Sequence, residues 1–120
     1  MKLTGVMLGS ENAKALGAFY EKLFGKPGWN QDDWFGFDIG GGNLMIGPHS
    51  EVKGKNDMPG RIMFMVESED VKADFAKLKD AGANVVAEPY QPSMDDTGGW
   101  LATLADIDGN YFQMATPWKA

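Results

Sequence analysis

The sequence predicts an α+β protein that uses one βαβββ module twice, and three observations lead to this fold class. First, Asp108-Gly109-Asn110 separates two apolar runs, and these residue types favour the tight turn of a hairpin. Second, Gly41-Gly42-Asn43 opens a similar apolar run, and Gly109 follows Gly42 by 67 residues. Third, adding 56 to positions 5, 12 and 19 gives positions 61, 68 and 75, with the same expected roles of strand start, helix cap and helix anchor.

The first module is expected over residues 1–48. A brief apolar run at residues 3–8, ended by Gly9-Ser10, predicts a strand rather than a helix. Ser10 or Asn12 can cap a helix that begins at Ala13, and Gly25 followed by Pro27 ends it. Its apolar positions recur at spacings of three and four: Leu16, Phe19, Tyr20 and Leu23. Three short strands are expected at residues 29–31, 34–39 and 43–46.

The second module is expected over residues 60–120, after a polar linker rich in Gly and Pro at residues 49–59. A strand is predicted at residues 61–66. Ser68 is predicted to cap a second helix, which buries Val71, Phe75 and Leu78 and ends at Gly82. Further strands are predicted at residues 84–87, 100–105 and 110–115. We therefore expect residues 1–120 to form a single domain of two modules.

The composition excludes several classes of protein. The chain has 17 acidic and 11 basic residues and a net charge of -6, which opposes binding to nucleic acid and to anionic membranes. It has no cysteine, which excludes disulfides and thiolate chemistry and agrees with a reducing cytosol. No stretch has the length and apolarity of a signal peptide or a membrane span. We expect a soluble cytoplasmic protein.

Three motifs, taken in their order and spacing, resemble the vicinal oxygen chelate superfamily, which includes glyoxalase I, bleomycin-resistance proteins and extradiol dioxygenases. They are Phe19-Tyr20 in the first helix, Ala81-Gly82-Ala83 at the end of the second, and residues 106–113, close to the family's terminal Asp-Pro-Asp-Gly-Asn signature. The resemblance implies that the modules form a cup-shaped mixed sheet with the helices on its outer face. It also implies that metal and substrate lie on the concave face and that the protein is a homodimer.

The same resemblance implies where metal ligands would lie. Enzymes of this family place four ligands, of the types His, Glu and Gln, on positions that the two repeat offsets map to Gly5, Ile46, Arg61 and Gln113. Only Gln113 can coordinate a cation, and an arginine cannot lose its proton to become a ligand. We therefore expect no metal, no other cofactor and no catalytic residue at these positions.

Side-chain alternation along the strands predicts which residues line the cup. Inward positions of Gly5, Arg61 and Gln113 imply a soft apolar lining with one cation, one amide and one phenol. Such a lining suits an apolar or aromatic ligand that carries an anionic or polar group. The expected ligand-binding residues are Met7, Trp34, Ile46, Arg61, Met63, Met65, Trp100, Tyr111 and Gln113, with the faces of the two tryptophans left open.

Plainer interpretations of these residues stay open. The methionines can fill a core or a dimer interface, and Arg61 can pair with Asp38 or Glu88. Gln113 can simply hydrogen-bond to Arg61 or Tyr111. The only histidine, His49, is expected to be a solvated loop residue, and the same default holds for Asp95-Asp96, although that pair could be half of a metal site.

Three functions fit the sequence. The expected one is a metal-free protein that binds a small apolar or aromatic molecule, like the drug-sequestering members of the family. The first alternative is a glyoxalase-like or dioxygenase-like metalloenzyme with a displaced site, built from Gln113 with His49, Glu88 or Asp95. The second is a structural module whose cup is filled by its own side chains.

Overall fold

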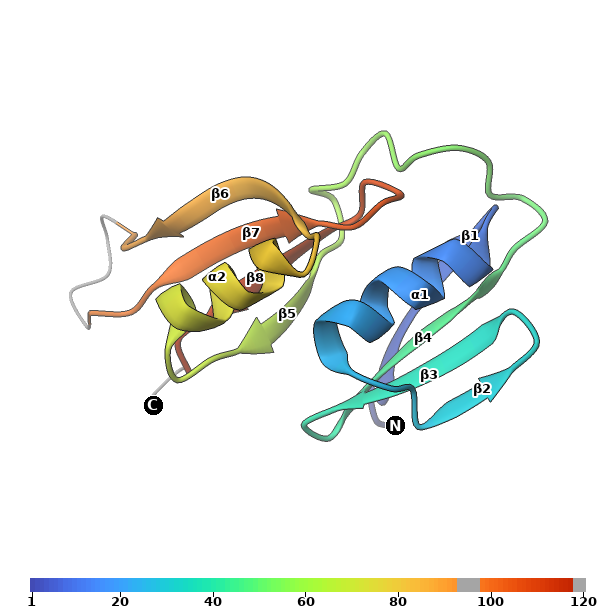
Figure 1. Ribbon diagram of the computed structural model, residues 1–120, viewed down its shortest axis with the longest axis horizontal. Coiled ribbons are helices and arrows are strands. Elements are labelled where there is room, and N and C mark those ends of the chain that lie inside the picture. The colour runs from blue at the N-terminus through green and yellow to red at the C-terminus, as the bar shows by residue number, and fades with distance from the viewer. Residues whose placement is uncertain (93–97, 118–120) are drawn as a thin grey trace. The chain divides into compact units, whose positions relative to one another are not determined.

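The computed structural model describes residues 1–92 and 98–117, and in these ranges the predicted α+β fold of two βαβββ modules is confirmed (Figure 1). The chain divides into two compact units, Met1–Lys55 and Asn56–Ala120. The first unit contains β1 (Gly5–Ser10), α1 (Ala13–Phe24), β2 (Trp29–Gln31), β3 (Trp34–Ile39) and β4 (Gly42–Pro48). The second contains β5 (Phe64–Glu67), α2 (Val71–Asp80), β6 (Asn84–Tyr90), β7 (Leu101–Ala105) and β8 (Tyr111–Ala115).

In the first unit, α1 covers one face of a sheet with the strand order β1-β4-β3-β2 (Figure 1). β1 runs parallel to β4, and the other neighbours are antiparallel. Alternation buries Phe35, Phe37, Leu44 and Ile46 on the helix side. The helix can approach the sheet closely because Gly17 has no side chain. Any side chain there would collide with the ring of Phe35. Burial of this face accounts for most of the core of the unit.

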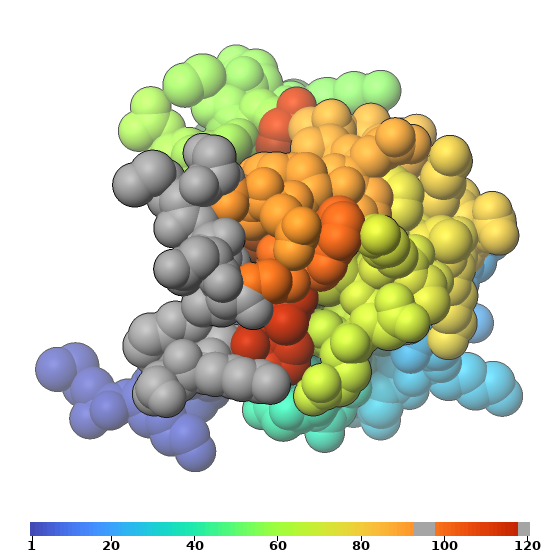
Figure 2. Space-filling view, turned by 90° about the vertical axis from the view of Figure 1, so that its left-hand side faces the viewer, coloured from blue at the N-terminus to red at the C-terminus, as the bar shows by residue number. Residues whose placement is uncertain are grey.

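The second unit repeats the arrangement, with the strand order β5-β8-β7-β6 and a parallel pair of β5 and β8. α2 buries Val71, Phe75 and Leu78, as predicted. On the same side of the sheet, Phe112 is fully buried and stacks on Phe64 with 5.0 Å between the ring centroids. Figure 2 shows β6, in orange, and α2, in yellow-green to yellow, on the surface of this unit.

The two helices begin with the same hydrogen bonds, which corrects the predicted cap of the second helix. The Ser10 hydroxyl accepts from the Asn12 amide at 3.0 Å, and the Asn12 side chain caps α1 by accepting from the amide of Ala15 at 3.2 Å. The Ser68 hydroxyl accepts from the Asp70 amide at 3.1 Å, and Asp70 is the cap. Ser68 was a wrong choice because serine and aspartate both suit a cap, and only the hydrogen bonds separate them.

This correction also changes the internal repeat. Ser10 and Asn12 correspond to Ser68 and Asp70, so the offset between the modules at this point is 58 rather than 56. The predicted strand at residues 61–66 is displaced in the same direction, because β5 begins only at Phe64, where its pairing with Phe112 of β8 begins. Arg61 and Met63 therefore precede the strand.

The other predicted strands differ from the structure only at their ends. β2 and β3 have the predicted bounds. β1 lies two residues later than predicted, and β4 extends beyond the predicted strand at both ends. Both bounds follow from the parallel pairing of β1 with β4 from Gly5 to Ser10. β6 continues to Tyr90, with two register shifts against β7. Such irregular pairing is common in edge strands.

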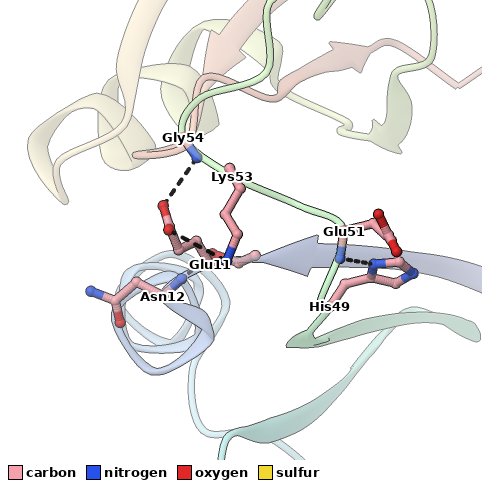
Figure 3. Close-up of polar contacts among 7 residues, drawn as sticks. Glu11, Asn12, His49, Glu51, Lys53 and Gly54 are labelled. Atoms are coloured by element: carbon pink, nitrogen blue, oxygen red, sulfur yellow. Dashed lines mark hydrogen bonds and ion pairs between the residues drawn. The ribbon is translucent and has the colours of Figure 1, made fainter.

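The predicted linker at residues 49–59 is held by hydrogen bonds on both sides of the boundary between the units. In the first unit, the Gly54 amide donates to Glu11 Oε1 at 3.1 Å, and Lys53 Nζ lies 3.9 Å from Glu11 Oε2 (Figure 3). In the second unit, the Asn56 amide donates to the carbonyl of Asp108 at 2.8 Å. Lys55 alone lies between these two anchored residues.

The turn between β7 and β8, at the signature segment, is built around Asp106, whose side chain is only 1% exposed. Its carboxylate accepts from the amides of Asp108 and Asn110 and from the Asn110 side chain. Gly109 has a φ of 80°, as predicted for a tight turn. Neither helix in the described ranges has the length and apolarity that a membrane crossing requires.

Candidate functional site

Each sheet has one face under its own helix and a second face opposite that helix, which we call the open face of the unit. Paired residues of neighbouring strands point to the same face, so the strand register assigns every strand residue to one side.

The open face of the first unit is organised by one row of residues that crosses all four strands. We call it the central row, and its members are Met7 of β1, Met45 of β4, Gly36 of β3 and Trp29 of β2. Met7 is 45% exposed and Trp29 is 47% exposed. The two thioethers and the indole therefore lie at an accessible surface, whereas Ile46 and Phe35, one residue along, lie in the core.

Glycines and two tryptophans shape this face. The ring of Trp34 lies directly over Gly47, where any side chain would collide with it. Trp29 lies beside Gly36, with its Cβ and Cε3 atoms 3.8 Å from the position of a Cβ there. Because Gly36 and Gly47 have no side chains, the two indole rings can lie against the sheet and present flat aromatic surface.

Polar groups lie in the next row of the same face. Asn43 and Asp38 are paired, so their side chains share the open face. The side-chain oxygen of Asn43 lies 3.8 Å from the position of a Cβ on Gly36. Asp38 is exposed, and its Oδ1 accepts from the Gly41 amide at 3.0 Å. This face thus combines thioethers, indoles, one amide and one carboxylate.

The open face of the second unit has a central row of Met65, Gln113, Thr103 and Ala87. Met65 is 60% exposed, and Gln113 Nε2 lies 3.5 Å from Thr103 Oγ1, a long hydrogen bond. Tyr111 and Glu67 lie in the flanking rows. This row corresponds to that of the first unit, with Met65 in the place of Met7 and Gln113 in the place of Met45.

Five of the nine residues predicted to bind a ligand lie on open faces. Two belong to the first unit and three to the second. They are Met7, Trp34, Met65, Tyr111 and Gln113. The structure tests their position and not their binding, so a ligand role for these five stays a prediction.

The other four lie elsewhere. Ile46 is fully buried on the α1 side, and the open-face residue at this point is its neighbour Met45. Trp100 lies on the α2 side, where Lys72 Nζ is 4.0 Å from the centroid of its ring. Arg61 and Met63 precede β5, so strand alternation does not assign them to a face. Arg61 is exposed and forms no ion pair with Glu88 among the contacts of the described residues.

The residues of the central rows do not fit the divalent metal that the family's enzymes bind. The strand register brings Met7, Met45, Met65 and Gln113 to the central rows, and a divalent cation needs several N or O donors, usually with negative charge. Three thioethers and one amide do not supply them. Within residues 1–92 and 98–117, no three His, Cys, Asp or Glu side chains are grouped as a metal site.

The described residues of the displaced-site alternative, His49, Glu88 and Gln113, do not belong to a group of three His, Cys, Asp or Glu side chains that could hold a metal. His49 is exposed, and its Nδ1 accepts from the Glu51 amide at 3.1 Å (Figure 3). Glu88 lies on the edge strand β6. Asp95 and Asp96 lie outside the described residues.

The open-face residues that the sequence interpretation missed are Trp29, Gly36, Asp38, Asn43, Met45 and Thr103. A signal for some of them was present. The short turn between β2 and β3 sets the register of that hairpin, and this register pairs Trp29 with Gly36. Their face could have been derived once the register was known.

Two successive βαβββ units, in each of which the first and last strands pair in parallel, define the vicinal oxygen chelate class of proteins. A family model for the glyoxalase-like domain matches residues 5–115, so the chain belongs to the glyoxalase-like domain family. A comparison with curated proteins found no match.

Solved structures are similar over almost the whole chain. A structure described as a conserved domain protein is 23% identical with a TM-score of 0.79, over 98% of this chain and 100% of that chain. A glyoxalase-related enzyme from Fulvimarina pelagi is 20% identical with a TM-score of 0.76, over 97% and 88%. A glyoxalase/bleomycin resistance protein/dioxygenase from Alicyclobacillus acidocaldarius is 14% identical with a TM-score of 0.73, over 98% and 92%. At these identities the similarity concerns the fold.

Proposed function

We propose that this chain is a metal-free small-molecule-binding protein of the glyoxalase-like domain family, cytoplasmic and homodimeric, that holds an apolar or aromatic ligand against an open face. One observation carries the proposal. The central rows hold exposed thioethers and an indole in place of the several N and O donors that a divalent metal needs.

The chemistry of these side chains supports binding rather than turnover. Methionine is flexible and polarizable, so its thioether adapts to ligands of irregular shape and makes favourable contacts with aromatic rings. Trp29 and Trp34 add flat surfaces for stacking. Gln113 adds a polar anchor in the second unit. No pair of an acid and a base, and no nucleophile with a base beside it, is found among these residues.

The test is a thermal-shift screen of a broad library of apolar and aromatic compounds. A compound at 100 times its Kd should stabilise the protein by about 2.7 kcal/mol, which raises the Tm measurably. The variant Met7→Gln should lose most of the shift, because it replaces the thioether on the open face by an amide of similar length. Met58→Gln is the matched control, since Met58 is an exposed methionine (56%) outside every strand.

Two results would contradict the proposal. One is a library in which no compound changes the Tm. The other is a stoichiometric amount of Zn, Ni, Mn or Fe in the purified protein, measured by mass spectrometry of the elements, because a bound metal of this kind would favour the enzyme alternative.

A further inference from the structure

We infer that the open face of the first unit binds a planar aromatic cation. This inference rests on the proposed function and deepens it, because it names the chemical class of the ligand. The sequence alone suggested the opposite charge, since Arg61 was expected on the binding face. Arg61 precedes β5, so strand alternation does not place it on either open face, and its role stays a prediction.

Charged side chains are distributed unevenly between the strands and the helices. None of the strands β1 to β8 contains a lysine or an arginine. The helices α1 and α2 carry Lys14, Lys22, Lys72, Lys77 and Lys79, and each helix lies on the face of its sheet opposite the open face. The strands do contain acidic residues: Asp38, Glu67 and Glu88.

The open face of the first unit carries one strand carboxylate, that of Asp38. Asp38 follows Gly36 by two residues, so the carboxylate stands about 7 Å along the strand from the glycine beside Trp29. Its Oδ1 accepts from the Gly41 amide, and Oδ2 has no hydrogen bond to a described residue. A carboxylate that accepts a backbone hydrogen bond is held in place, so it can face a ligand cation with little rearrangement.

The surface around Asp38 suits an aromatic cation. An indole face attracts cations through its quadrupole, and Trp29 and Trp34 both lie on this side of the sheet. Thioethers are polarizable and contact aromatic rings favourably. The side-chain oxygen of Asn43, beside Gly36, is a further acceptor. An anionic ligand would meet Asp38 and no strand cation, whereas a cationic one meets complementary charge.

A contact between a cation and an indole also occurs among the described residues of the chain itself. In the second unit, Lys72 Nζ lies 4.0 Å from the centroid of the Trp100 ring, on the helix side. The net charge of -6 adds a long-range attraction for cations, which favours their encounter with the protein.

The experiment compares three bicyclic probes of similar shape: N-methylquinolinium, neutral quinoline and anionic 2-naphthoate. Affinities are measured at pH 7.5 by quenching of tryptophan fluorescence and by calorimetry, in 20 and 150 mM salt. We expect the cation to bind about tenfold more tightly than quinoline, with an advantage that falls as salt rises. We expect 2-naphthoate to bind most weakly.

Variants identify the group that selects the charge. In Asp38→Asn, the amide oxygen can still accept from Gly41, so the turn is preserved while the charge is removed, and the ratio of the two affinities should approach one. Glu21→Gln is the matched control, because Glu21 is an exposed acid on α1, on the other side of the same unit. It should leave the ratio unchanged. The Tm of each variant checks that it is folded.

The outcomes separate this inference from the proposed function. Equal binding of cation and neutral probe, tightest binding of 2-naphthoate, or full selectivity in Asp38→Asn would each overturn the inference and leave a binding protein. If neither these probes nor any library compound binds, the inference and the proposed function both fail.

Discussion

At the turn between β7 and β8, the Asp106 carboxylate is buried and fully used as an acceptor. Oδ1 accepts from the amides of Asp108 at 2.9 Å and Asn110 at 3.0 Å, and Oδ2 accepts from Asn110 Nδ2 at 2.9 Å. The Asn110 side chain in turn accepts from Asn56 Nδ2 at 3.0 Å. These bonds offset the cost of burying a charge. This buried member of the signature segment therefore has a structural role.

The substitution Asp106→Asn tests this role. The new amide keeps one oxygen for the two backbone donors, but its NH₂ group faces the NH₂ group of Asn110, so two donors meet without an acceptor. We expect a loss of about 1–3 kcal/mol in the free energy of unfolding, measured by urea denaturation. Asp33→Asn, at an exposed turn position, should change it by less than about 0.5 kcal/mol. Equal stability of the two variants would argue against the structural role.

Residues also show where the sequence was sufficient and where it was not. Trp34 and Trp100 stand at similar places in the two predicted modules, yet one lies on an open face and the other contacts Lys72 on the helix side. The register gives the reason. Thr103 pairs with Gln113 as Gly36 pairs with Met45, so the counterpart of Trp34 is Leu101 and not Trp100. A difference of one residue reverses the face.

At the scale of elements, α1, β2 and β3 had clear local signals in the apolar spacing of the helix and in the turn residues on either side. β5 had no comparable signal. Its apolar run extends upstream to Ile62, but its pairing with β8 begins only at Phe64. The start of a strand depends on where its partner is, and local sequence does not contain that information.

The anchored segment between the units leads to a prediction about proteolysis. The bond after Lys53 carries the Gly54 amide, which donates to Glu11. We expect Glu11→Ala to increase the rate of tryptic cleavage after Lys53, because the amide loses its acceptor and the segment opens more often. Mass spectrometry of a short digest identifies the cleaved bond.

The matched control for this experiment is Glu21→Ala, which removes an exposed acid of α1 that has no hydrogen bond to the segment. Its digest should resemble that of the parent protein. Unchanged cleavage after Lys53 in Glu11→Ala would mean that the hydrogen bond to Glu11 does not hold the segment closed.

At the scale of the whole molecule, the sheets leave edge strands that bear on the proposed homodimer. β1 and β2 are the edges of one sheet and β5 and β6 of the other, within the described residues (Figure 1). On β6, Val86 is 42% exposed and Tyr90 is 44% exposed. Exposed edges with apolar side chains favour association with a second copy.

Sedimentation equilibrium measures the state of association directly. The chain has a mass of 13.1 kDa, so a homodimer has twice that mass, about 26 kDa. Each copy carries a charge of -6, so we expect the dimer to strengthen as added salt screens the repulsion. We also expect the Tm to rise with protein concentration. A mass of 13.1 kDa at every concentration and salt level would exclude the homodimer.

By itself, the sequence determined the two-module α+β fold, the helices, the hairpin turn at Gly109 and the family, because these depend on local spacing and turn chemistry. Only the tertiary structure decided the offset of 58, the cap at Asp70, the burial of Ile46 and the open-face positions of Trp29 and Asp38. These depend on which residues pair across strands. Side chains alternate with a period of two, so the face of each residue follows from its partner and not from its own type.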